Sequence, residues 1–166
     1  MKITIIFLGC CVLAISLSLS TQLSATASAQ DGEKGNAAVV ARKGFQEVSG
    51  WVTMSAEMVP AEKYDYKPVD TVRSFGQIIA HVADSLNYFC AQAAGKKMTG
   101  DSAEKGATDK ATLLPKLKQA VDGCNTVYAS DNGKIEPLLE NIAHTNLHYG
   151  NLITYLRMMG MKPPSS

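Results

Sequence analysis

Three histidines are the side chains of this sequence best suited to hold a metal ion: His81, His144 and His148. His144 and His148 are four positions apart, so in a helix both imidazoles lie on one face, one turn apart. If the segment that carries His81 packs beside them, three neutral imidazoles face one point. That donor set is typical of a catalytic divalent metal site with an open coordination position, since a structural zinc site needs a fourth protein ligand.

The spacing of this histidine pair also has less specific interpretations. A histidine on an amphipathic helix is more often a hydrogen-bonded, partly exposed side chain than a ligand. Thr145 follows His144, so the glutamate that serves as general base in the zinc-protease motif is missing. A haem-binding bundle would pair a histidine with Met54 or Met58, but methionine at helical spacing usually fills a core.

Four helical segments must position the histidines. Apolar residues recur at helical spacing in each, and no segment is typical of a strand. Ser74 with Gln77 forms a capping box, the clearest helix start in the chain. The sequence therefore predicts an all-α protein, a four-helix bundle over residues 37–166, with antiparallel neighbours among the last three helices. The expected helices are 37–58, 75–95, 112–129 and 137–160, the first with its apolar stripe running from Val40 to Met58.

The first 29 residues are typical of a secretory signal peptide. Lys2 precedes an apolar run from Ile3 to Leu19, and Ala27-Ser28-Ala29 matches the small-x-small pattern of a signal peptidase site. The alternatives are a transmembrane anchor, for which the run is short, and a lipoprotein modified at Cys10. We expect cleavage after Ala29, an exported protein (periplasmic or secreted) without a membrane anchor, and a flexible lead over residues 30–36.

Charge and cysteine content restrict the partners. The chain has 16 Lys and Arg against 15 Asp and Glu, which argues against nucleic acid as the main partner. After cleavage two cysteines remain, Cys90 and Cys124, and in an oxidising compartment such a pair often forms a disulfide. The alternative is that both cysteines are buried as free thiols. The partner we expect is a small molecule, and a bundle of this size readily forms a homodimer.

From Trp51 onward the sequence resembles the DinB family, a superfamily of DinB/YfiT-like four-helix-bundle metalloenzymes. The resemblance rests on VRSFGQIIAHVAD at residues 72–84, IAHTNLHYGN at 142–151, and the Tyr-Leu-Arg…Gly…Pro-Pro ending within 155–165. It implies a three-histidine metal site on the same three residues that spacing selects. Many relatives have Gln three positions after the last ligand, where this chain has Asn151. We expect the shorter amide to weaken a contact near the ion without removing a ligand.

Two further side chains are candidates for roles beside the metal. Asp84, one turn after His81, is expected to orient an imidazole through its free ring N–H. Tyr155, seven residues after His148, is expected to offer its hydroxyl to a bound ligand. The alternative for Asp84 is an ordinary surface charge, and the alternative for Tyr155 is a tyrosine that packs in the core. Glu140 is a weaker candidate that more often would face solvent.

The resemblance also implies a class of reaction. Characterised relatives include thiol-dependent S-transferases and a thiol-dependent isomerase, so a metal-dependent transferase or hydrolase that activates a water or a thiol is expected. Export argues against a reaction in which the metal activates a small thiol, because small thiols are largely cytosolic. The alternative is a non-catalytic metal-binding or stress-associated helical bundle. Zinc or nickel is the favoured ion, and we expect its release as the imidazoles protonate below about pH 6.5.

Overall fold

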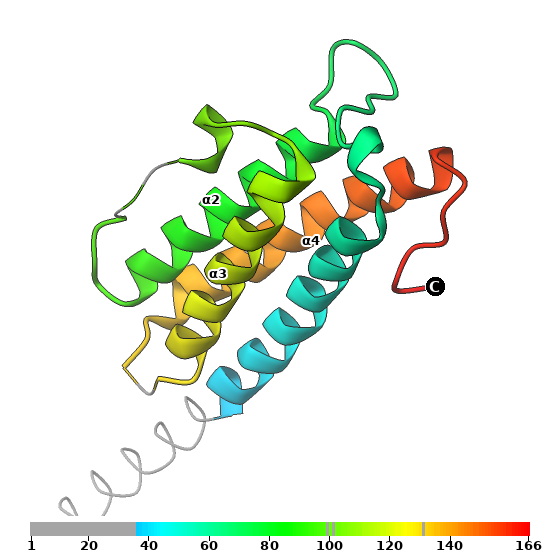
Figure 1. The fold of residues 1–166 in the computed structure, drawn as a ribbon. Coiled ribbons are helices and arrows are strands. Elements are labelled where there is room, and N and C mark those ends of the chain that lie inside the picture. Colours follow the sequence, from blue (N-terminus) through cyan, green and yellow to red (C-terminus); the bar gives the residue numbers. More distant parts are fainter. Residues whose placement is uncertain (1–35, 99, 101, 131) are drawn as a thin grey trace, which may run out of the picture. The chain divides into compact units, whose positions relative to one another are not determined.

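The structure, a computed structural model, describes residues 36–98, 100, 102–130 and 132–166. The expected signal peptide and residues 30–35 of the expected lead lie outside the described residues, and Asn36 is helical. The described part contains four long helices, two short 3-10 turns and no strand, which confirms the all-α prediction (Figure 1). The helices are residues 36–58, α2 (Phe75–Ala93), α3 (Lys110–Tyr128) and α4 (Ile135–Met158), and the turns are η1 (Ala61–Lys63) and η2 (Ala103–Lys105).

Local sequence sets where the helices begin. The Ser74 hydroxyl accepts a hydrogen bond from the Gln77 backbone N–H, and the Gln77 side chain accepts one from the Ser74 N–H, so the predicted capping box is confirmed. At α3 the side chain of Asp109 accepts a hydrogen bond from the Thr112 N–H at 2.9 Å. This cap starts α3 two residues earlier than predicted, which leaves Pro115 inside the helix, beyond its first turn.

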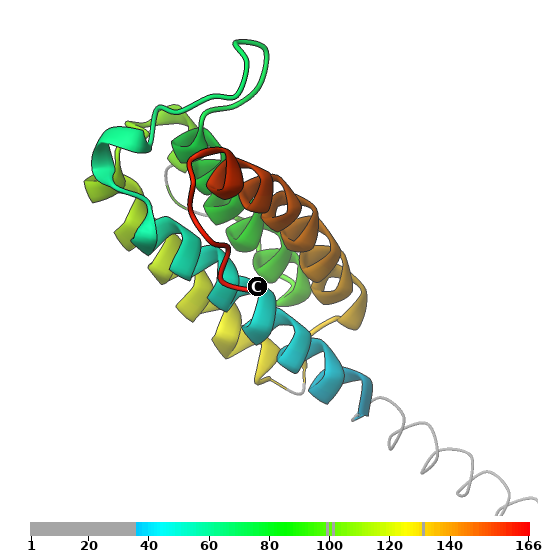
Figure 2. The same cartoon turned by 90° about the vertical axis from the view of Figure 1, so that its right-hand side faces the viewer.

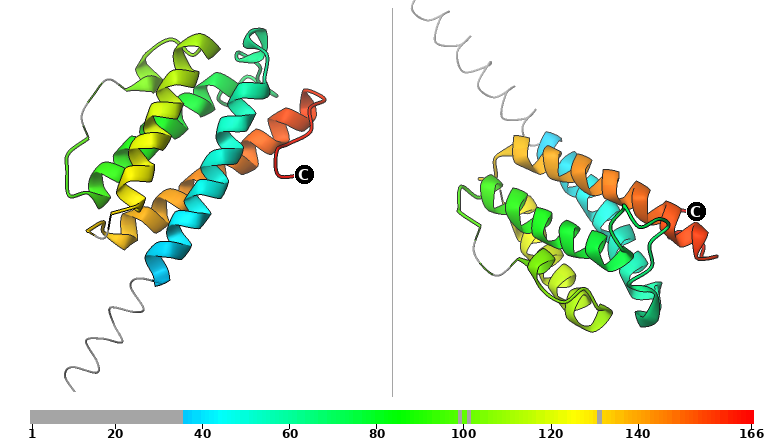
Figure 3. Two further views of the ribbon diagram at one scale, coloured as in Figure 1. Left: turned by 60° about the horizontal axis from the view of Figure 1, so that its bottom comes forward. Right: turned by 90° about the horizontal axis from the view of Figure 1, so that it is seen from above.

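The direction of α3 corrects the predicted topology. Gly76, near the start of α2, lies against Thr108, just before α3, so closely that a Cβ would collide with its carbonyl. Cys90 and Cys124, near the ends of the two helices, are joined by a disulfide with their Cα atoms 5.4 Å apart. Hence α2 and α3 run parallel (Figure 3). The 16-residue connection between them spans about 50 Å when extended, enough to return along a 19-residue helix of about 28 Å.

The helix over 36–58 closes the bundle against α3 and α4. Phe45 stacks on Tyr128 of α3 with 4.3 Å between ring centroids. Trp51 stacks on Tyr149 of α4 at 5.2 Å. The chain end then folds back along this side, where the Tyr149 hydroxyl donates a hydrogen bond to Ser165 (Figure 2). On the opposite side α2 packs against both α3 and α4, and this packing places the helix of His81 beside the helix of the other two histidines.

Apolar side chains fill the interior between the helices. The largest fully buried ones come from all four long helices and include Phe45, Ile79, Leu86, Leu113, Leu117, Leu152 and Leu156. Val40 and Met58, expected in the apolar stripe of the first helix, are exposed, Val40 to 62%. The buried face keeps the predicted Phe45, Val48 and Val52 and is extended by Ala41 and Ala56, small residues that carry little weight in a hydrophobic pattern. None of the helices in the described part of the chain has the length and apolarity needed to cross a membrane.

Candidate metal centre

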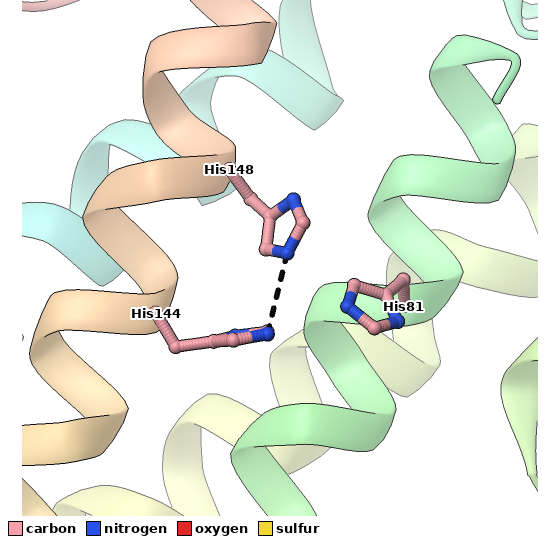
Figure 4. A group of neighbouring side chains, drawn as sticks. All are labelled: His81, His144 and His148. Carbon is pink, nitrogen blue, oxygen red and sulfur yellow. Dashed lines mark hydrogen bonds between the residues drawn. The ribbon is translucent and has the colours of Figure 1, made fainter. Parts of the chain in front are cut away.

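The packing of α2 on α4 brings the three predicted ligands together. One side-chain nitrogen from each of His81, His144 and His148 lies within 4.8 Å of the others. Figure 4 shows the imidazoles gathered in one space between the two helices. The Nε2 atoms of His144 and His148 are 3.3 Å apart. Two nitrogens bound to one tetrahedral zinc ion, at 2.0–2.1 Å each, would be about 3.3 Å from each other, so this pair already has the spacing of two ligands.

The hydrogen bonding of these imidazoles also fits a cation. The Nδ1 atoms of His144 and His148 are buried and have no hydrogen-bond partner among the described residues. Their Nε2 atoms face each other, and two neutral imidazoles can place only one N–H between them. An ion in that space would accept both Nε2 lone pairs and leave Nδ1 as the protonated nitrogen of each ring. Three neutral imidazoles are a donor set that zinc, nickel, iron and copper accept.

Burial holds the α4 histidines in the neutral form that binds metal. Desolvation, followed by the charge of the neighbouring imidazoles, lowers the pKa of His148 to about 4. The same two causes, in the same order, lower the pKa of His144. His148 is 8% exposed, whereas His144 and His81 are partly exposed. Because protons compete for the lone pairs that bind an ion, these lowered pKa values extend the range of metal binding to more acidic pH.

We expect the metal-free protein to lose stability as the pH falls from about 6.5 towards 4. In that window the unfolded chain protonates at the ordinary histidine pKa of about 6.5, whereas folded His148, with a pKa of about 4, does not. The unfolded state therefore binds more protons, and the free energy of unfolding falls by at most about 1.4 kcal/mol per pH unit for this residue. Denaturant titrations of chelator-treated protein at several pH values measure the free energy of unfolding. In His148→Gln this free energy should depend less on pH. A free energy of unfolding that rises on acidification would contradict it.

The carboxylate beside His81 is Glu104, from η2, and this corrects the role expected of Asp84. Glu104 Oε1 lies 3.1 Å from Nδ1 of His81. The carboxylate of Asp84 instead accepts hydrogen bonds from the Ser102 hydroxyl and from the backbone N–H groups of Ala103 (2.7 Å) and Glu104 (3.0 Å). Asp84 thus fixes η2, and η2 presents Glu104 to the imidazole. With Nδ1 of His81 bound to Glu104, Nε2 remains to bind an ion.

Removing this carboxylate should weaken metal binding. We expect Glu104→Ala to lower the affinity for a divalent ion by about 10–100-fold, because a carboxylate on the far ring nitrogen fixes the ring and raises the basicity of the ligating nitrogen. Competition with a chelator of known affinity measures the change. Glu62→Ala, which removes an exposed glutamate from η1, is the matched control. An unchanged affinity in Glu104→Ala would show that the contact to His81 plays no part in metal binding.

The hydroxyl of Tyr155 has a different partner from the one predicted. The Tyr155 hydroxyl donates a hydrogen bond to the backbone carbonyl of Arg73 at 2.7 Å, and its ring packs edge-on against Tyr66. Burial raises the pKa of this hydroxyl. Tyr155 therefore anchors the start of α2 to α4, and its hydroxyl proton is committed to the backbone. Asn151 is exposed on α4, as is Glu140.

A small cavity lies beside Glu104, the residue that contacts His81. Its volume is about 120 Å³, and its lining residues are Arg73, Gln77, Ala80, Glu104 and Thr108. Glu104 belongs both to this lining and to the contact with His81. Its carboxylate also accepts a hydrogen bond from the Arg73 guanidinium at 3.3 Å. The centre therefore combines three ligand nitrogens, a supporting carboxylate and an adjoining space with a cation on its wall.

A comparison with known protein families gives a match over the part of the chain that carries the histidines. The model of the DinB superfamily matches residues 52–151, well over half of the chain, and the matched range contains all three histidines. Comparisons with curated proteins and with solved structures give no match. The family match confirms the resemblance and contains the motifs at 72–84 and 142–151, whereas the ending within 155–165 lies outside the matched range. This chain belongs to the DinB superfamily.

Proposed function

We propose that this protein is an exported metalloprotein that binds a divalent ion through His81, His144 and His148 and acts as a metal-dependent transferase or hydrolase. The observation that carries the proposal is the convergence of three imidazole nitrogens from two helices within 4.8 Å. Three protein ligands leave room for an outside ligand. Zinc or nickel is the ion we propose, and export rests on the signal-peptide pattern of residues 1–29.

The surrounding residues support chemistry at such an ion. A divalent ion at this position would lower the pKa of a bound water or thiol towards neutrality. Glu104 holds the ring of His81, and burial keeps the ring of His148 neutral. His81 and His144 are partly exposed, and the cavity lined in part by Glu104, which contacts His81, gives a small molecule space nearby. These features favour a site that admits a reactant over one that only stores metal.

The test begins with the open coordination position. Mature protein is loaded with Co²⁺, its metal content is measured, and azide is added while the visible absorption is followed. We expect bound cobalt near one ion per chain and a change in absorption as azide enters the coordination sphere. A spectrum that does not respond to azide would mean a closed site and would overturn the catalytic proposal.

Catalysis itself needs a second measurement. Zinc- and nickel-loaded protein is screened against thiol-conjugation and ester substrates, with metal-free protein as the control. Turnover that depends on the metal supports a transferase or hydrolase. Absence of turnover across both classes, with metal bound, would favour the alternative of a non-catalytic metal-binding bundle.

A further inference from the structure

We propose that the cavity lined by Arg73 and Glu104 binds the carboxylate group of a small-molecule substrate through Arg73, while the reactive end of that molecule extends past Glu104 to the ion. The inference rests on the proposed function and adds to it a class of substrate, a small monoanion.

Arg73 supplies the charge and the donors for such a group. Among the described residues its side chain hydrogen bonds to Glu104 alone, at 3.3 Å, and it is 51% exposed. A guanidinium carries five N–H donors in a planar fork that matches the two oxygens of a carboxylate. Most of these donors therefore remain available. The cavity volume of about 120 Å³ suits a carboxylate on a short carbon chain.

The position of Arg73 is fixed relative to both helices that carry the ligands. Its backbone carbonyl accepts the Tyr155 hydroxyl from α4, and it directly precedes the N-cap of α2. Glu104 Oε1 contacts both the guanidinium and Nδ1 of His81, so one oxygen atom separates the cation from a ligand ring. A molecule held by Arg73 is thus near the ion.

The rest of the cavity wall favours a single negative charge. The first backbone N–H groups of α2 are already bonded, those of Phe75 and Gly76 to carbonyls and that of Gln77 to its capping hydroxyl. An anion must therefore be held by side chains. Of the other lining residues, Glu104 adds a negative charge. Because like charges repel, the carboxylate of Glu104 in the cavity wall disfavours a dianion such as phosphate more than it disfavours a singly charged carboxylate.

The experiment compares two thiols on Co²⁺-loaded mature protein. The probes are 3-mercaptopropionate and 3-mercaptopropionamide, which carry the same thiol and differ in the carboxylate. Thiolate-to-cobalt charge-transfer absorption reports binding at the ion, and metal content is measured in every variant. We expect the carboxylate probe to half-saturate at a concentration about tenfold lower than the amide, the scale of a charged hydrogen bond.

Three variants test whether Arg73 is the group that holds the carboxylate. In Arg73→Gln the two thiols should half-saturate at about equal concentrations. Arg73→Lys keeps the positive charge without the planar fork of donors and should retain part of the preference for the carboxylate probe. Arg157→Gln removes an exposed cation at the end of α4 and should keep the full preference. Since Arg73 is half exposed, these variants should fold, and thermal unfolding checks that they do.

The possible outcomes distinguish this inference from the proposed function. Absence of charge-transfer absorption with either thiol would overturn both, because no outside ligand would then reach the ion. Equal binding of the two thiols would overturn the inference and leave the metal centre standing. A preference that persists in Arg73→Gln would also overturn it, because the carboxylate would then contact the ion itself.

Discussion

Alanine at His144 or His148 is expected to lower the affinity of the protein for a divalent ion by well over tenfold. The Nε2 atoms of these residues are 3.3 Å apart and face each other, so each variant removes one of three ligand nitrogens. Loss of a group that only supports a ligand typically costs 10–100-fold, and loss of the ligand itself should exceed that. Chelator competition gives the affinity, and elemental analysis gives the metal content as purified.

The matched control lies on the same helix. Asn146→Ala removes an exposed polar side chain between the two histidines, one whose amide bonds only within α4. It should keep the affinity of the unchanged protein. His81→Ala should behave like the α4 variants, which would show that both helices contribute to one site. Metal content that stays the same in His144→Ala would contradict the three-histidine centre.

Local patterns predicted much of what positions this site. The capping box at Ser74 fixes where α2 begins, and with it the turn on which His81 lies. The four-residue spacing of His144 and His148 places both rings on one face of any helix. These properties depend on residues within a few positions of one another. They could therefore be read from the sequence, and the convergence of the three rings followed once α2 and α4 were neighbours.

The connection between α2 and α3 is where sequence patterns were insufficient. The parallel direction of α3 depends on the path of residues 94–109, and loop length alone does not determine it. Glu104 lies in that connection, 23 positions from His81, and no periodicity links the two. Asp84 has a spacing that suggested a direct role at an imidazole, yet its oxygens bind the backbone of η2. The supporting carboxylate is thus set by tertiary packing.

That connection and the disulfide beyond it lead to a second large effect. Reduction of the bond between Cys90 and Cys124 is expected to lower the free energy of unfolding by about 2–4 kcal/mol. The bond closes a loop with a sequence separation of 34 and ties α2 to α3. Its sulfur atoms are buried, and the Asn141 amide lies 3.6 Å from that of Cys90. Guanidinium unfolding at equilibrium, with and without reductant, measures the difference.

The double variant Cys90→Ala/Cys124→Ala separates the bond from other effects of a reductant. Its unfolding midpoint should not respond to reductant and should lie close to that of the reduced protein, because both lack the link between the helices. Since His81 is carried by α2 and packs towards α4, the folded variant should keep its metal content while losing stability. Equal midpoints for the oxidised and reduced protein would show that the bond contributes nothing to stability, and the packing of α2 on α3 would then suffice to hold them parallel.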